Sequence, residues 1–224
     1  MKIKPGTVET SPKRVRVYKD GQVVADSTEP RLVWENPFYP QYYFPESDVR
    51  VDLLDPALVH RPTEDEPGGG RRVPLLRLDW DAMDAWFEED EEIIVHPRSP
   101  YTRVDALRSQ RHIRVEVDGV EVANSTAAVI LFETYLPTRY YLPKTDVRMD
   151  LLSPSDTQTS CPYKGTANYY DVTIDGATHE DLVWWYPSPL PESAPIANHV
   201  CFFNEKVDIF VDGEPLRRPR TKWS

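Results

Sequence analysis

The chain carries one 41-residue segment twice. Residues 14–54 read RVRVYKDGQVVADSTEPRLVWENPFYPQYYFPESDVRVDLL, and residues 112–152 read HIRVEVDGVEVANSTAAVILFETYLPTRYYLPKTDVRMDLL. The two copies align without a gap at a constant offset of 98, and 18 of the 41 positions are identical. Identity at this level and at one fixed spacing indicates an internal repeat. We therefore predict two tandem homologous domains, residues 1–100 and residues 101–224, related by a pseudo-twofold axis.

Each copy has the residue pattern of β-strands. Polar and apolar residues alternate at 14–18 and 112–117, and each run leads to an Asp-Gly pair, which is a strong hairpin signal. Further short runs are rich in β-branched and aromatic residues, at 23–25, 31–35, 129–133, 169–174, 182–186 and 207–211. The 22 prolines leave little room for helices. We predict a mainly β chain of antiparallel sheets, with residues 97–110 as an irregular connector.

The two copies differ after the repeated segment. The second copy continues into the sequence CPYKG at residues 161–165, and the first copy has no such turn. Alignment of residues 86–87 with residues 202–203 leaves the first copy about 18 residues shorter. Loops and hairpins tolerate such a deletion better than a core does. We therefore predict a degenerate first repeat and an intact second repeat that carries a pocket.

Several motifs resemble those of a known family. They are Glu133, Arg139-Tyr140-Tyr141, Asp146-Val147, the CPYKG sequence, Trp185-Tyr186-Pro187 and Phe202-Phe203, with residues 86–91 and His96-Pro97 in the first repeat. On these residues, which extend over nearly the whole chain, the sequence resembles the two-repeat form of the domain of unknown function 427 family. The resemblance implies a small, mostly antiparallel β domain of tent-like or barrel-like shape in each half. It implies no settled activity.

The composition narrows the function classes. The formal net charge of −11 argues against a nucleic-acid partner, because phosphate binding requires a basic surface. No window approaches the roughly 20 apolar residues of a membrane span, and residues 1–5 lack an apolar signal core. Two cysteines, Cys161 and Cys201, are too few for a disulfide framework. We expect an acidic cytoplasmic protein without a membrane partner, and the sequence leaves its oligomeric state open.

Lys164 and Cys161 are candidate functional residues of the CPYKG sequence. Lys164 lies between Tyr163 and Gly165, so we expect it on a turn, where its ammonium can face a cleft and bind an anion or a carbonyl oxygen. The alternative is a surface turn with a solvated lysine. Cys161 is a candidate nucleophile if a neighbouring cation stabilises its thiolate, and otherwise a packing residue.

Glu133 is the candidate acid or base. It ends an apolar strand that is expected to enter the core, and a buried carboxylate needs a partner or a proton. Arg139, Arg148 and Lys164 are the available partners. The alternative is a structural ion pair, which is favoured by the presence of Glu35 at the same position of the first repeat.

The second repeat is dense in aromatic residues. Strand alternation places Trp184 and Tyr186 on one face and Trp185 on the other, so that one set can fill the core while the other lines a pocket. An aromatic box with a lysine and a glutamate at its rim suits a small ligand. The alternative is that most of these rings belong to the core. The residues that we expect to bind the ligand are Arg139, Tyr141, Tyr163, Trp185 and Tyr186.

The sequence contains no motif for a metal or a cofactor. The five histidines show no paired ligand spacing, and neither a Cys-x-x-Cys motif nor a glycine-rich phosphate loop is present. We therefore expect no metal and no cofactor. One hypothesis is a metal-free small-molecule enzyme of hydrolase, lyase or isomerase type, with Glu133 as acid or base, Lys164 as anchor and Cys161 beside them. The other is a non-catalytic module that binds a small ligand in an aromatic pocket.

Overall fold

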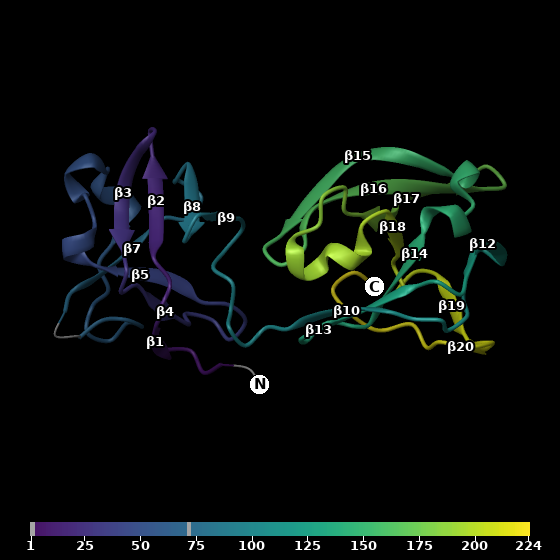
Figure 1. Ribbon diagram of the computed structural model, residues 1–224, viewed down its shortest axis with the longest axis horizontal. Coiled ribbons are helices and arrows are strands. Elements are labelled where there is room, and N and C mark those ends of the chain that lie inside the picture. Colours follow the sequence, from purple (N-terminus) through teal and green to yellow (C-terminus); the bar gives the residue numbers. More distant parts are fainter. Residues whose placement is uncertain (1–2, 71–72) are drawn as a thin grey trace. The chain divides into compact units, whose positions relative to one another are not determined.

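The computed structural model describes residues 3–70 and 73–224 (Figure 1). The chain divides into two compact units, unit one with residues 1–101 and unit two with residues 102–224. Regular structure in the described residues consists of antiparallel strands and short 3-10 turns, which confirms the predicted fold class. Within the same residues, no helix has the length and apolar character needed to span a membrane.

The described residues of unit one form two antiparallel sheets. The larger has the order β1 (Val8–Thr10), β4 (Arg31–Val33), β5 (Gln41–Pro45), β7 (Leu75–Leu78) and β6 (Val59–His60). The smaller has the order β3 (Gln22–Ser27), β2 (Val15–Lys19), β8 (Ala85–Glu88) and β9 (Glu91–Ile93). The 3-10 turns that follow β5 are η1 (Glu46–Asp48), η2 (Val51–Leu53) and η3 (Pro56–Leu58).

Unit two repeats this plan and extends it. Its larger sheet has the order β10 (Val104–Arg108), β13 (Val129–Glu133), β14 (Arg139–Pro143), β18 (His199–Phe202), β17 (Ala177–Trp185), β16 (Gly165–Ile174) and β15 (Leu152–Cys161). Its smaller sheet has the order β12 (Val120–Ser125), β11 (Ile113–Val117), β19 (Asp208–Val211) and β20 (Glu214–Pro215). Its 3-10 turns are η4 (Lys144–Asp146), η5 (Met149–Leu151) and η6 (Pro191–Ile196). The long strands β15 and β16 have no counterpart among the described strands of unit one (Figure 1).

The strand registers correct the alignment of the two repeats beyond residue 54. Trp86 on β8 pairs with Val17 on β2, and Ile209 on β19 pairs with Val115, which is the repeat equivalent of Val17. Trp86 therefore corresponds to Ile209, and the expected match of residues 86–87 with residues 202–203 is wrong. Similar aromatic pairs suggested that match, whereas pairing with the first strand of the repeat fixes the true register.

The registers also locate the insertion in the second repeat. Val59 and Val183 pair with equivalent positions of β7 and β18. Val59 lies five positions after Leu54, but Val183 lies 31 positions after Leu152, so the second repeat has 26 additional residues rather than 18. These residues build the β15–β16 hairpin, which carries the CPYKG turn at its end.

Strand alternation divides the core of unit two between the two faces of its larger sheet. Leu142, Val183 and Val200 face a cluster shared with the smaller sheet. Their chain neighbours Tyr141, Trp184 and Cys201 belong to a second buried cluster on the opposite face, as the two-residue period of a strand requires. Because neighbouring residues face opposite sides of the sheet, the second cluster, which includes Tyr141, Trp184 and Tyr186, is available to line a site.

Two further sequence expectations are corrected by the structure. The expected irregular connector at residues 97–110 is confirmed only for residues 97–103, which carry no strand and include the boundary between the units, because residues 104–108 form β10 and pair with β13 at the edge of the larger sheet. An edge strand is partly exposed on both faces, so its sequence has little periodicity. The larger sheets in the described residues are open, and the barrel-like shape implied by the resemblance is therefore not formed.

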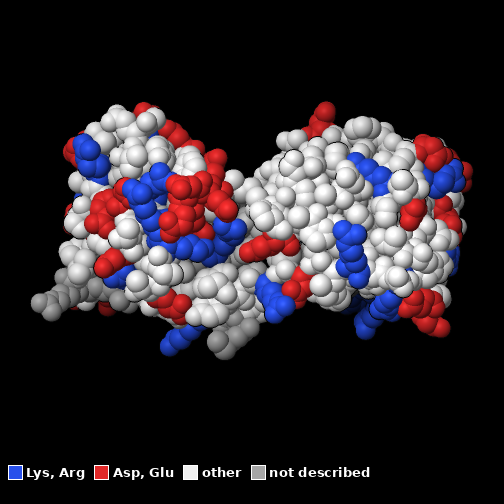
Figure 2. Space-filling view, in the orientation of Figure 1, with Lys and Arg blue, Asp and Glu red and all other residues white. Residues whose placement is uncertain are grey.

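Acidic and basic side chains are interleaved on unit one near β2 and β8 (Figure 2). Arg16 and Asp90 form an ion pair of 2.7 Å there. Glu88 is buried instead, and its carboxylate accepts a hydrogen bond from Tyr42 Oη at 2.9 Å and pairs with Lys13 Nζ at 2.5 Å. Part of the negative charge of the chain is thus neutralised locally.

Candidate functional site

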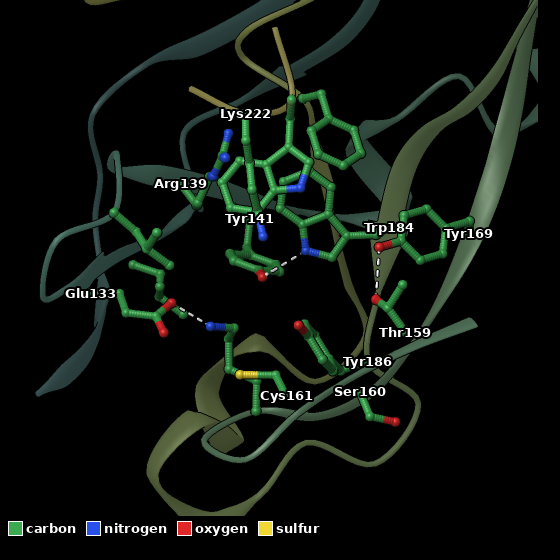
Figure 3. Close-up of a pocket in the computed structure, with 15 residues that line it drawn as sticks. Glu133, Arg139, Tyr141, Thr159, Ser160, Cys161, Tyr169, Trp184, Tyr186 and Lys222 are labelled. Carbon is green, nitrogen blue, oxygen red and sulfur yellow. Dashed lines mark hydrogen bonds and ion pairs between the residues drawn. The ribbon is translucent and has the colours of Figure 1, made fainter. Parts of the chain in front are cut away.

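Unit two contains a cavity of about 330 Å³ with a mainly apolar and aromatic wall (Figure 3). This volume lies at the small end of the range usual for ligand pockets. The wall is built from β13 to β17, the hairpin turn and the C-terminal segment. Its residues are Leu131, Glu133, Leu136, Arg139, Tyr141, Thr159, Ser160, Cys161, Lys164, Tyr169, Trp184, Tyr186, Phe203, Lys222 and Trp223.

The turn between β15 and β16 brings Lys164 into this wall. The amide of Lys164 donates to the carbonyl of Cys161 at 3.3 Å, and its carbonyl accepts from the amide of Leu190 at 3.1 Å. Gly165 follows with a φ of +97°, and a Cβ atom at this position would lie 3.1 Å from the carbonyl oxygen of Ser188. Glycine alone accommodates both conditions at low cost. The turn is therefore fixed by its neighbours, and the Lys164 side chain starts from a constrained backbone.

Lys164 and Glu133 form an ion pair in the cavity wall. Nζ of Lys164 donates to Oε2 of Glu133, and the two side chains are only 10% and 9% exposed. Burial alone would lower the pKa of Lys164, but attraction to Glu133, together with that to Cys161, outweighs burial and raises this pKa. The ammonium is therefore held in its charged form. Of the partners expected for Glu133, Lys164 is the one that the structure supplies.

The two thiols lie in different surroundings. Cys161 is partly exposed and lines the cavity, whereas Cys201 is fully buried, and neither forms a disulfide. Burial raises the pKa of Cys201 to about 12, so this thiol remains neutral and acts as a core residue. Only Cys161, of these two, is placed to contact a ligand. No group of three or more His, Cys, Asp or Glu side chains in the described residues is arranged to hold a metal ion.

Aromatic hydroxyls face the cavity beside the ion pair. Trp184 Nε1 donates to Tyr141 Oη at 3.0 Å, and the hydroxyls of Tyr141 and Tyr186 point into the cavity (Figure 3). Burial raises the pKa of both tyrosines well above the usual value, so both hydroxyls keep their protons. Tyr169 and Thr159 share a hydrogen bond of 2.8 Å between their hydroxyls. The site therefore offers neutral hydroxyl donors next to a charged pair.

Arg139 is held by a second buried ion pair at the other end of the cavity. Its guanidinium donates to both carboxylate oxygens of Glu205, at 2.6 and 2.8 Å, and these side chains are 9% and 0% exposed. Burial alone would raise the pKa of Glu205, but the hydrogen bonds from Arg139 and Thr221 outweigh it and lower this pKa. The guanidinium also lies 5.3 Å from the ring centre of Trp184. Both charges of the pair are thereby satisfied within the protein.

The structure brings most of the predicted site residues together. Those that line the cavity are Glu133, Arg139, Tyr141, Cys161, Lys164 and Tyr186. Tyr163 and Trp185 do not line it, so their expected place in the pocket is corrected. The backbone carbonyl of Tyr163 accepts from the hydroxyl of Ser193, and the side chain of Trp185 stacks on Tyr170 with the Lys144 ammonium 3.1 Å from its ring centre. Trp185 lies on the face of β17 opposite to Trp184, because successive strand residues alternate.

Sequence reasoning missed the contribution of the C-terminal segment. Lys222 and Trp223 line the cavity although they belong to no strand. The available signal was a single tryptophan in an otherwise polar and basic run, RRPRTKWS at residues 217–224. A large aromatic side chain in such a run indicates that the segment is anchored to the protein.

Unit one has hollows that lie away from the repeat equivalents of the cavity residues. Glu35 and Tyr43 are the repeat equivalents of Glu133 and Tyr141. Two hollows of unit one, of about 300 and 350 Å³, are lined by residues around Pro74 and around Ser47, and neither includes Glu35 or Tyr43. These hollows are therefore not counterparts of the cavity in unit two.

Comparison with protein-family models identifies the family of the chain. A family model described as a domain of unknown function (DUF427) matches residues 7–65 and 105–213. Each matched range contains one copy of the repeat, and the second also contains the β15–β16 hairpin and most of the cavity. A search of curated proteins found no match. The family description names no activity, so the function has to be derived from the chemistry of the site.

Proposed function

The chain belongs to the DUF427 family, and we propose that its second unit is a small-molecule enzyme of hydrolase, lyase or isomerase type that uses acid–base chemistry. Glu133 is the general base or acid, Lys164 binds a carbonyl oxygen of the substrate, and the aromatic wall holds the remainder of the molecule. The observation that carries this proposal is the buried Glu133–Lys164 pair in the wall of an otherwise aromatic cavity.

The pair has the chemical properties that such a reaction requires. The carboxylate of Glu133 can take a proton from a substrate carbon atom or from water. A lysine ammonium has three donors, so Lys164 can keep its bond to Glu133 and also donate to a carbonyl oxygen on which negative charge develops. Aromatic walls exclude water and strengthen both interactions. Cys161 borders the same space and is the nucleophile that we assign to a hydrolytic reaction.

One observation favours a non-catalytic binding module as the second candidate. Glu35 of unit one also has a cationic partner, Arg77, at 3.1 Å, although unit one lacks the inserted hairpin. A glutamate that is paired in both repeats can be a structural feature. In this case the aromatic cavity binds a small molecule without chemical change.

The test uses the full chain and a matched pair of variants. Glu133→Gln and Glu35→Gln remove the same charge at equivalent repeat positions. The proteins are incubated in heavy water with a panel of 2-oxo acids, aldehydes, esters and lactones, and proton NMR follows carbon–hydrogen exchange and hydrolysis. We expect Glu133→Gln to reduce the rate on an active compound at least about 100-fold, because general acid–base groups contribute about 10²- to 10⁴-fold. Glu35→Gln is expected to keep the wild-type rate.

Two results would contradict the enzyme. Binding of panel compounds without exchange or hydrolysis by the wild-type protein would favour the binding module. An equal loss of rate in both variants would show that the glutamates act through the fold instead of through the substrate.

A further inference from the structure

The charges around the cavity are unequally satisfied. Lys164 is paired with Glu133, and Arg139 is paired with Glu205 through two hydrogen bonds. Lys222 also lines the cavity, but it forms no ion pair with any residue in the ranges 3–70 and 73–224. Two cations are thus neutralised and one is not, so the excess positive charge of the cavity belongs to Lys222.

The segment that carries Lys222 is attached to the charged wall. Thr221 Oγ1 donates to Glu205 Oε1 at 2.7 Å, and the same carboxylate oxygen accepts from Arg139. The backbone amide of Trp223 in turn donates to Thr221 Oγ1 at 3.1 Å. One threonine hydroxyl therefore links the segment to the buried Arg139–Glu205 pair and places Lys222 at the cavity.

The same segment adds an aromatic surface. The Trp223 ring centre lies 5.6 Å from the Arg139 guanidinium, which also lies 5.3 Å from the ring centre of Trp184 and 5.9 Å from that of Phe203. Three rings thus surround one cation at this end of the cavity. A flat ligand group can pack against such a surface, and Lys222 is the adjacent charge that it can reach.

We propose that Thr221, Lys222 and Trp223 form an anion-binding lip of the cavity, and that the ligand is a single-ring or similarly flat molecule with one anionic group. The anion pairs with Lys222, the ring packs against Trp223, and the opposite end of the molecule reaches Glu133 and Lys164. The assignment of Glu133 and Lys164 to the opposite end of the ligand rests on the proposed function, whereas the anion-binding lip is tested by ligand affinity without any reaction. A volume of about 330 Å³ restricts the ligand to a small molecule.

The experiment measures binding of benzoate, phenylacetate and phenyl phosphate by calorimetry, with benzamide as the uncharged probe. The variants are Lys222→Gln, Thr221→Val and Lys164→Gln, and Arg220→Gln is the matched control, because it removes one charge from the same basic segment without lining the cavity. We expect Lys222→Gln to weaken the anions about tenfold and to leave benzamide unchanged. Thr221→Val is expected to weaken all probes, because it releases the segment. Arg220→Gln is expected to bind as wild type does.

The outcomes separate the lip from the reaction. Three results would each overturn the proposal. The first is anion affinity that does not change in Lys222→Gln, and the second is a loss of anion affinity in Arg220→Gln as large as that in Lys222→Gln. The third is a preference for anions over benzamide that is lost only in Lys164→Gln. Failure of the wild-type protein to bind any of the anions would overturn the ligand class. A preference for phenyl phosphate over benzoate, or the reverse, identifies the anionic group. A Glu133→Gln variant that binds benzoate as wild type does, but no longer turns over an active panel compound, supports both proposals. A wild-type protein that binds the anions but turns over none of the panel compounds contradicts only the proposed enzyme.

Discussion

The two repeats retain the same glutamate and give it different cations. In unit one, Glu35 accepts a hydrogen bond from Tyr43 Oη at 2.7 Å and pairs with Arg77 at 3.1 Å. In unit two, Glu133 pairs with Lys164, which comes from the inserted hairpin. The glutamate is therefore part of the common plan of the fold, and its partner is the feature that changed.

Strand register explains why the two glutamates take their cations from different segments. Arg77 is the cross-strand neighbour of Tyr43, and Cys201 is the cross-strand neighbour of Tyr141. A cysteine side chain is much shorter than an arginine side chain, so Cys201 cannot reach Glu133 in the way that Arg77 reaches Glu35. In unit two the hairpin supplies Lys164 to satisfy the buried carboxylate. The cation therefore comes from the neighbouring strand in unit one and from the inserted hairpin in unit two.

The most disruptive test of this comparison is Cys201→Arg, which gives unit two the residue of unit one. The new guanidinium would enter a fully buried position near a cavity wall that already contains Lys164. We expect a loss of about 3–5 kcal/mol in the free energy of unfolding, because an unpaired buried charge and overpacking both destabilise. Binding of benzoate should also be lost. Urea unfolding and calorimetry measure these two effects.

A second substitution shows whether the two cations are equivalent. Lys164→Ala in the Cys201→Arg background frees Glu133 to pair with the new arginine, as Glu35 pairs with Arg77. We expect this double variant to recover at least half of the lost stability while the cavity stays filled. A double variant no more stable than Cys201→Arg would show that Arg77 and Lys164 are not interchangeable partners.

The next comparison sets a buried acid of unit two against an exposed one of unit one. Glu205 pairs with Arg139, and Asp26 pairs with Arg14. Burial alone would raise the pKa of Glu205, but the hydrogen bonds from Arg139 and Thr221 outweigh it and lower this pKa. The pKa of Asp26 is lowered chiefly by its hydrogen bond from Arg14. The side chain of Glu205 is fully buried, whereas Asp26 is 40% exposed. We expect Glu205→Gln to cost about 2 kcal/mol at pH 7, and Asp26→Asn to cost about 0–1 kcal/mol because solvent screens an exposed pair.

The contribution of Glu205 to the free energy of unfolding decreases as the pH falls. A carboxylate with a lowered pKa in the folded state stabilises the protein above its unfolded pKa, and this contribution disappears as the pH falls through the folded pKa. The stability difference between wild type and Glu205→Gln should therefore be constant near neutral pH and shrink below about pH 4, the usual range of a glutamate. Urea unfolding at several pH values measures it. A difference that grows with acidity would show that the Arg139–Glu205 pair does not stabilise unit two through its charge.

The repeat, the strand class and the CPYKG turn could be predicted because each depends on local residue patterns. The Asp-Gly hairpins at residues 20–21 and 118–119 and the alternation in β2 and β11 are short-range signals. The equivalence of Trp86 with Ile209 was not predictable in this way, since it depends on which distant strand pairs with β2. The same holds for the C-terminal segment, which is attached through contacts with distant residues, namely the hydrogen bond from Thr221 to Glu205 and the contact of Trp223 with Arg139.

The smallest expected effect compares the two turns of the inserted part of unit two, at Gly165 and Gly176. Both glycines have positive φ, +97° and +84°, so alanine costs about 1 kcal/mol at either position. A new Cβ atom at Gly176 meets nothing within 4 Å, whereas at Gly165 it lies 3.1 Å from the carbonyl oxygen of Ser188. We expect Gly165→Ala to cost about 1 kcal/mol more than Gly176→Ala and to weaken benzoate binding, because the shift of the turn moves Lys164. Equal unfolding free energies and equal benzoate affinities for the two variants would show that the close approach at Gly165 does not hold Lys164 in the cavity wall.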